Sequence, residues 1–265
     1  MIIKKLKLVP ELKNLYQLLK NLDRKVVIIF LSVAVLQTVS WYYTSRQFFK
    51  SFIFHQFQSN PNVYLLEYLY WFIGDFLSYF ILPFLIIKIL LKERVKSYGL
   101  TIGDFSAGLK ISFLFLTIMI PLVWIASSFP EFNKTYPHLA SARDSWITFF
   151  IFETGLLIYM FSWEFVWRGF MLFGLEEKFG YYTVLIQMIP FLILHDGKPA
   201  AEAFGAIVAG IALGILALRT RSILYCVIVH MGVMFSIDLI STLRYRAGDY
   251  GIGLDSFLNI IYELL

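Results

Sequence analysis

Residues 146–173 read WITFFIFETGLLIYMFSWEFVWRGFMLF and carry three charged side chains, Glu153, Glu164 and Arg168. A helix needs about 20 mostly apolar residues to cross the hydrocarbon core of a bilayer. This stretch is long enough for one crossing. Charged groups at that depth are costly and usually mark function. The stretch therefore predicts a transmembrane helix that carries part of a functional site.

The rest of the chain repeats the same apolar pattern. Of its 265 residues, 59% are hydrophobic and 15% are charged, with a mean hydropathy of +0.72. A soluble domain would have about 25% charged residues. The predicted spans are 26–45, 64–91, 107–128, 146–173, 181–195, 203–218 and 222–243. We expect an all-α fold, a polytopic membrane helical bundle of about seven to eight transmembrane helices.

The chain divides into four parts by charge and hydropathy. We expect a basic amphipathic cytoplasmic lead-in at 1–25, N-terminal transmembrane helices at 26–145, site-bearing helices at 146–243 and an amphipathic tail at 244–265. The lead-in lacks a clear signal-peptide cleavage site.

Basic residues also indicate the orientation of the chain. Lysine and arginine concentrate in the lead-in, at 92–96 and at 219–221, and such residues favour the cytoplasmic side. This predicts a cytoplasmic N-terminus and puts the 129–145 loop and the tail outside. Arg244 and Arg246 in the tail are a mild exception.

Several function classes are disfavoured. The net charge of +5 follows from the basic loops of a membrane protein, so nucleic-acid binding is not expected. Cys226 is the single cysteine, which excludes an intramolecular disulfide and a cysteine metal cluster. No two-fold repeat of interrupted helices is visible, which disfavours a transporter. Ala206, Gly210 and Gly214 form a small-residue stripe that predicts close helix packing.

The polar residues of the spans gather in the second half of the chain. Glu164 and Arg168 are four residues apart, so they can pair on one helical face. A structural ion pair would explain both of them. His195 and His230 lie on two other predicted spans, and a carboxylate with two imidazoles can also activate water and stabilise an oxyanion.

These motifs resemble those of the CPBP intramembrane proteases, the family of type II CAAX prenyl endopeptidases and of bacteriocin-processing or abortive-infection proteins. The resemblance rests on WEFVWRGF at 163–170, on FLILH followed by GKP at 191–199, and on a histidine after RTRSI. It covers roughly 145–240, and YGLTIGD at 98–104 extends it weakly upstream. The family implies an integral protein of a bacterial or archaeal cell membrane.

The family pattern is Glu-Glu-x-x-x-Arg, then Phe-x-x-x-His, then a later histidine followed by Asn or Asp. Glu164 and Arg168 match its first part, His195 its second, and His230 its third. The resemblance implies that glutamate and the first histidine activate water for peptide hydrolysis. It also implies that the later histidine supports the oxyanion. An older view of the family makes these residues metal ligands.

Two positions depart from the pattern. Trp163 stands where the first glutamate is expected, and Met234 stands where Asn or Asp is expected. Asp238, one turn further on and about 80° around the helix, is an imperfect substitute for that Asn or Asp. The departures indicate either a branch in which Glu164 serves as the base or a branch without activity.

Other charged residues have simpler interpretations. Glu202 is expected to be an acid at a helix N-terminus, favoured by the helix dipole. Glu153 lies ~16 Å from Glu164 along a helix and is expected to line the outer mouth of a cavity. Asp196 and Lys198 are expected to be loop charges at the interface.

We hypothesise an intramembrane endopeptidase whose catalytic residues are Glu164, His195, His230 and Arg168. Its substrate would be a membrane-embedded or lipid-anchored peptide or protein, and no cofactor is needed. Two alternatives stay open. One is a zinc protease with Glu164, His195 and His230 as ligands, since three such ligands and a water suit catalytic zinc. The other is a non-catalytic membrane scaffold that kept the fold.

Overall fold

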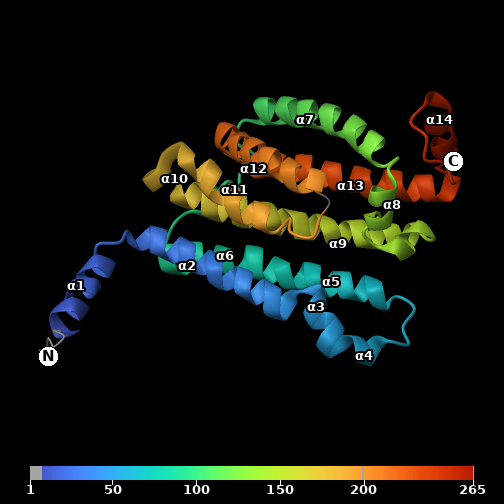
Figure 1. The fold of residues 1–265 in the computed structure, drawn as a ribbon. Helices are drawn as coiled ribbons and strands as arrows, with labels where there is room; N and C mark the ends of the chain where they lie inside the picture. The colour runs from blue at the N-terminus through green and yellow to red at the C-terminus, as the bar shows by residue number, and fades with distance from the viewer. Residues whose placement is uncertain (1–7, 199, 265) are drawn as a thin grey trace, which may run out of the picture.

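The computed structural model describes residues 8–198 and 200–264, and every regular element in these ranges is helical (Figure 1). The predicted all-α, polytopic membrane bundle is confirmed. Lys4, Lys5, Lys7 and Pro199, which entered the predictions, lie outside the described residues.

The α-helices are α1 (Leu8–Lys20), α2 (Arg24–Val39), α3 (Arg46–Phe48), α4 (Phe54–Phe57), α5 (Val63–Phe76), α6 (Leu82–Leu85), α7 (Phe105–Ala126), α8 (Pro130–Thr135), α9 (Trp146–Glu164), α10 (Gly174–Phe179), α11 (Thr183–Ile193), α12 (Ala200–Thr220), α13 (Leu224–Ala247) and α14 (Leu254–Tyr262). Segments of π-helix lie at Ser40–Thr44, Phe49–Ile53, Leu77–Ile81, Ile86–Leu91 and Phe165–Phe173, and 3-10 turns lie at Val95–Tyr98, Ala140–Arg143 and Gly180–Tyr182.

Within the described residues, six helical runs are long and apolar enough to cross a membrane. They are Arg24–Phe57, Val63–Leu91, Phe105–Ala126, Trp146–Ile193, Glu202–Thr220 and Leu224–Ala247. The predicted spans 146–173 and 181–195 fall together in the fourth run. α11 has 11 residues and is therefore only ~16 Å long.

The chain reverses inside the fourth run. Gly180 has a φ of +55°, a conformation that glycine adopts without strain, and α11 then runs back beside the π-helical segment Phe165–Phe173. The ring centroids of Phe191 and Trp163 are consequently 6.1 Å apart. α11 thus carries its C-terminal end to the middle of the bundle.

α11 and α12 form a tight hairpin. A Cβ atom at Gly210 would lie 2.8 Å from Met188 Cγ, and one at Gly214 would lie 2.9 Å from Gln187 Nε2. Ala206 on the same stripe is buried. The predicted packing role of these small residues is confirmed, because side chains here would force the two helices apart.

α9 lies between α5 and α13 in the bundle (Figure 1). A Cβ atom at Gly155 would lie 2.8 Å from Leu69 Cδ2, so α5 and α9 approach closely there. Phe152 packs edge-on against Tyr68 at 5.0 Å. This contact aligns the inner faces of α5 and α9 along one cavity.

Ser45 separates the helical segment ending at Thr44 from α3. Its backbone is extended, and its Oγ accepts a hydrogen bond from Phe48 N at 3.2 Å, which caps the new helix. The break directs Arg46 toward α5, where its Nε donates to Glu67 Oε1 at 2.5 Å.

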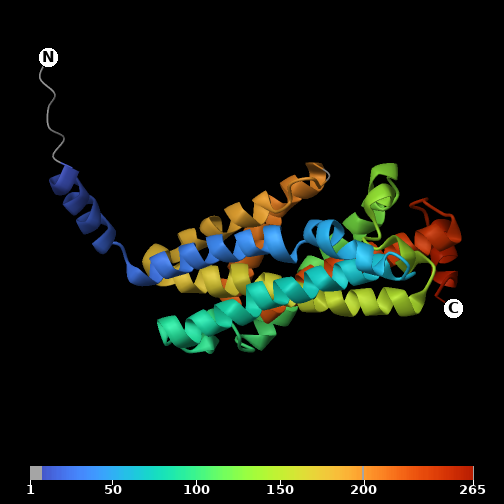
Figure 2. The ribbon, with the colours of Figure 1, turned by 90° about the horizontal axis from the view of Figure 1, so that it is seen from below.

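The three basic places lie together at one end of the bundle, as predicted. Lys25 Nζ pairs with Glu93 Oε2 at 3.0 Å, and Arg219 Nη1 pairs with Asp104 Oδ2 at 2.8 Å. α1 projects from this end and the C-terminal helix α14 lies at the other (Figure 2).

Candidate active site

The Glu164–Arg168 pair lies where α9 passes into the π-helical segment. Both side chains are fully buried, and Arg168 Nη1 donates to Glu164 Oε1 at 3.1 Å. The predicted pairing of these two residues is therefore confirmed. An isolated ion in the hydrocarbon would be far more costly than this neutralised pair.

His230 of α13 joins the same carboxylate. Its Nδ1 lies 2.6 Å from Glu164 Oε1. A carboxylate oxygen accepts, so Nδ1–H donates, and Nε2 is left for chemistry. The side chain of His230 lines a cavity, whereas Glu164 lies behind it, outside the cavity lining.

His195 lies in the turn after α11, and its Nδ1 donates to the Phe191 carbonyl at 2.8 Å. The ring of Phe191 contacts all of the basic groups. Its centroid is 4.7 Å from His195, 6.1 Å from His230 and 4.1 Å from Arg168 Cζ. The fold thus gathers three of the four predicted catalytic residues around one phenylalanine, and Glu164 joins two of them, Arg168 and His230.

The cavity has a volume of about 420 Å³ and lies between α2, α5, α9, α13 and the turn after α11. His195, His230, Trp163 and Met234 all line it. A hydrolytic site needs such a space for water and a peptide bond within reach of the imidazoles.

Trp163 occupies the position of the first motif glutamate. It is buried against Tyr159 and Trp167, with ring centroids 5.6 Å and 5.8 Å away. Its indole Nε1 has no hydrogen-bond partner among the described residues. Trp163 and Met234, the two departures from the family pattern, thus present an aromatic and an apolar side chain to the cavity.

Asp238 does not replace the missing Asn or Asp. Its carboxylate accepts the backbone N–H of His138 at 2.9 Å and the ring Nδ1–H at 3.0 Å. Both oxygens of Asp238 are therefore bound to His138 in the loop before α9. Sequence reasoning missed His138, because a loop histidine has no periodic signal that links it to α13.

Of the remaining charged residues, Glu202, Lys198 and Asp196 lie at the cavity or beside it, whereas Glu153 lies away from it. Glu202 lies in the first turn of α12, as predicted, and its Oε1 pairs with Lys198 Nζ at 3.5 Å. Lys198 lines the cavity and Asp196 lines an adjoining hollow. The expectation that Glu153 lines the cavity mouth is wrong. It is buried away from the cavity, because its face of α9 turns toward Asp238 on α13.

The donor set does not fit a zinc ion. In the described part of the chain, no three histidine, cysteine or carboxylate side chains are arranged to hold a metal. Catalytic zinc needs three protein ligands directed at one point.

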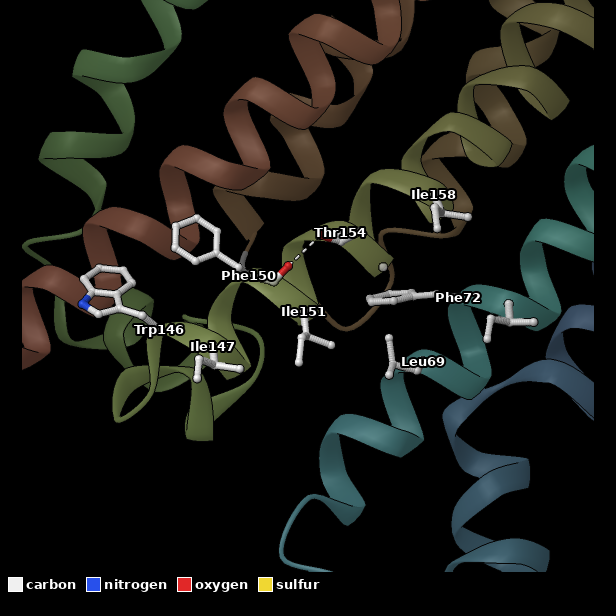
Figure 3. Close-up of a pocket in the computed structure, with 10 residues that line it drawn as sticks. Leu69, Phe72, Trp146, Ile147, Phe150, Ile151, Thr154 and Ile158 are labelled. Carbon is white, nitrogen blue, oxygen red and sulfur yellow. Dashed lines mark hydrogen bonds between the residues drawn. The ribbon is translucent and has the colours of Figure 1, made fainter.

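A second hollow, of about 650 Å³, lies on the other side of the α5–α9 contact (Figure 3). Its lining carries no charged side chain, and the hydroxyl of Thr154 donates to the Phe150 carbonyl at 2.8 Å. Phe72 lines both hollows and forms part of the wall between them. The apolar hollow offers no acid or base and suits contact with lipid.

Residues 142–236 match the family of Rce1-like type II CAAX prenyl endopeptidases. The resemblance to CPBP intramembrane proteases is therefore confirmed. At the level of the family, this match is to CAAX-type membrane proteases. No curated protein and no solved structure matches the chain. Glu164, His195 and His230 lie inside the matched segment, whereas His138 and Asp238 lie outside it.

Proposed function

We propose that the protein is an intramembrane endopeptidase that cleaves a membrane-embedded or lipid-anchored peptide. The observation that supports this most strongly is the 2.6 Å contact of Glu164 Oε1 with His230 Nδ1 beside a cavity that His195 also lines. A histidine oriented by a buried carboxylate is a common general base.

In this proposal His230 takes the proton from water, and Glu164 orients it and stabilises the imidazolium. This differs from the expectation that Glu164 itself is the base, because Glu164 is fully buried and does not line the cavity. The positive charge of Arg168 favours the ionised form of Glu164, because it balances the negative charge of the carboxylate within the hydrocarbon.

The reaction balances with these residues alone. The water oxygen bonds to the peptide carbonyl carbon while its proton moves to His230 Nε2. The neutral ring of His195, whose Nδ1–H donates to the Phe191 carbonyl, accepts a hydrogen bond from the same water at Nε2 and so positions that water for attack. His230 then returns its proton to the leaving nitrogen as the C–N bond breaks.

The proposal predicts that His230→Ala, His195→Ala and Glu164→Gln each lower turnover by about a hundredfold or more. Proteomics of membrane fractions would compare the wild type with each variant and identify an uncleaved precursor. Gly205→Ala is a suitable control, because a methyl group there meets nothing within 4 Å. Unchanged processing in the Glu164→Gln and His230→Ala strains would reject the proposal.

A second candidate is a non-catalytic membrane scaffold that kept the fold. Trp163, which fills the position of the motif glutamate with a buried aromatic ring, favours it. Under this alternative, Glu164→Gln would preserve the cellular phenotype while truncation of the bundle would abolish it.

A further inference from the structure

Several aromatic side chains and one fully buried carboxylate line the cavity beside His230. We propose that this cavity binds an ammonium group, the side chain of a lysine in the substrate peptide. This inference deepens the proposed endopeptidase function and rests on it for the identity of the ligand as a substrate.

The carboxylate is Asp75 of α5. It is 1% exposed, lines the cavity, and accepts hydrogen bonds from Thr44 Oγ1 at 2.6 Å and Trp71 Nε1 at 2.8 Å. Both donors are neutral. A carboxylate in the hydrocarbon is costly unless a cation accompanies it.

Asp75 differs in this respect from Glu202, the other cavity carboxylate, and from Glu67 on the same helix. Glu202 pairs with Lys198, and Glu67 pairs with Arg46 and Lys50. No cation pairs with Asp75 among residues 8–198 and 200–264. The cations Arg46 and Lys198, which also line the cavity, are thus already neutralised.

A series of aromatic rings in contact leads from Trp71, beside Asp75, to Trp163, next to Glu164. Trp71 lies 4.7 Å from Tyr159, and Tyr159 lies 5.6 Å from Trp163. Tyr79 meets Trp163 at 6.2 Å in a T-shaped contact. All of these rings line the same cavity. Ring faces attract cations, and aromatic cages are a recurring binding site for ammonium groups.

Trp163 links this cage to the hydrolytic residues. It contacts Phe191 at 6.1 Å, and Phe191 contacts both His195 and His230. An ammonium group in the cage would therefore lie close to the peptide bond that the water activated by His230 attacks. The substitution that removes the motif glutamate also supplies one wall of the cage.

The depth of Asp75 favours a peptide over a lipid head group. The run Val63–Leu91 has 29 residues and is ~43 Å long, and Asp75 lies ~18 Å from its start. Lipid head groups lie outside the ~30 Å hydrocarbon core. A lysine side chain on an inserted peptide reaches this depth.

The test measures binding without cleavage. Full-length His230→Ala protein in phosphatidylglycerol nanodiscs is titrated with apolar peptides of one sequence that carry lysine, trimethyllysine or norleucine at a single position. Lysine and trimethyllysine peptides are expected to bind at least tenfold more tightly than the norleucine peptide. Equal binding of the three peptides overturns the proposal.

Variants locate the preference. Asp75→Asn is expected to remove the tenfold preference for lysine, and Tyr159→Leu to weaken it severalfold, with norleucine binding unchanged. Glu153→Gln is the matched control, a buried acid that does not line the cavity, and should keep the preference. If Asp75→Asn does not fold, Tyr159→Leu decides. A preference that survives the folded variants overturns the site.

Two further experiments ask whether the ligand is a peptide or a lipid head group, and whether the protein cleaves what it binds. Loss of the preference in phosphatidylcholine discs would assign the site to the lipid head group and overturn the peptide assignment. A wild-type protein that binds lysine peptides selectively but cleaves none retains the ammonium site and rejects the proposed endopeptidase.

Discussion

Among single residues, Glu164 shows how a charge is held inside the hydrocarbon. Its Oε1 accepts from Arg168 and from His230, while its Oε2 has no partner among the described residues. The arginine neutralises the charge of the carboxylate, and the histidine donates a second hydrogen bond to the same oxygen. Removal of Arg168 leaves a buried negative charge that the fold does not compensate.

Arg168→Leu is expected to destabilise the protein by about 3–5 kcal/mol, because it leaves Glu164 as an uncompensated buried charge. The double variant Glu164→Gln/Arg168→Leu should recover much of that loss. Chemical unfolding in detergent of the wild type, both single variants and the double variant would measure the coupling. Additive effects would contradict the buried pair.

The pairing of Glu164 with Arg168 could be predicted from the sequence. The four-residue spacing of Glu164 and Arg168 sufficed for their pairing, because helical geometry relates neighbours on one face. The pairing of Asp238 with His138 was not predictable, because the loop and α13 meet only in the folded bundle. The sequence therefore suggests a substitute role for Asp238 that its contact with His138 does not support.

Among the helical elements, the α11–α12 hairpin determines where His195 lies. α11 is held against α12 by the small-residue stripe, and its short length puts His195 near the C-terminal end of α9, where Phe191 meets Trp163. The predicted span 181–195 contains α11 and the turn that holds His195. Its reversal at Gly180 depends on packing against the segment that precedes it.

Gly214→Val is expected to destabilise the hairpin by about 1–3 kcal/mol, since its side chain would collide with Gln187 and Val184. It should also reduce any peptidase activity by moving His195. Thermal unfolding and precursor processing would measure both effects. Gly205→Ala, in an open position of the same helix, should be neutral or slightly stabilising.

The N-terminus of α7 offers a pH-dependent test outside the membrane spans. The backbone N–H of Ala107 and the guanidinium of Arg219 lower the pKa of Asp104. A lowered pKa means that the ionised acid stabilises the fold above its unfolded pKa of about 3.9. This contribution is lost as the pH falls through the folded pKa.

Asp104→Asn should therefore unfold at a lower temperature than the wild type at pH 7, and the difference should shrink as the pH falls below about 4. Thermal unfolding across this pH range would measure the effect. A difference that does not change with pH would mean that the charge of Asp104 contributes nothing.

In the whole molecule, the charged loops agree with one orientation. The three basic places lie at one end, where Lys25 meets Glu93 and Arg219 meets Asp104. The exceptional arginines of the tail are used in the fold. Arg244 donates to Ser127 Oγ at 2.7 Å, and Arg246 donates to the Arg143 carbonyl at 2.6 Å. These hydrogen bonds tie α13 to other segments at the far end of the bundle.

We propose a cytoplasmic N-terminus, and cysteine labelling can test it directly because the native Cys226 is buried. A membrane-impermeant maleimide should label Tyr250→Cys in intact cells. It should label Lys96→Cys only after the cells are permeabilised. The wild type should stay unlabelled, and the reverse pattern would assign the opposite orientation.

The sequence by itself determined the membrane-bundle class, the basic end and the Glu164–Arg168 pair. Each of these follows from hydropathy or helical spacing over a few turns. Tertiary structure alone decided that His230 meets Glu164 and that Phe191 joins the two histidines. It also decided that Asp75 faces a cage of rings. These contacts join residues far apart in the chain, and no local periodicity specifies which helices pack together.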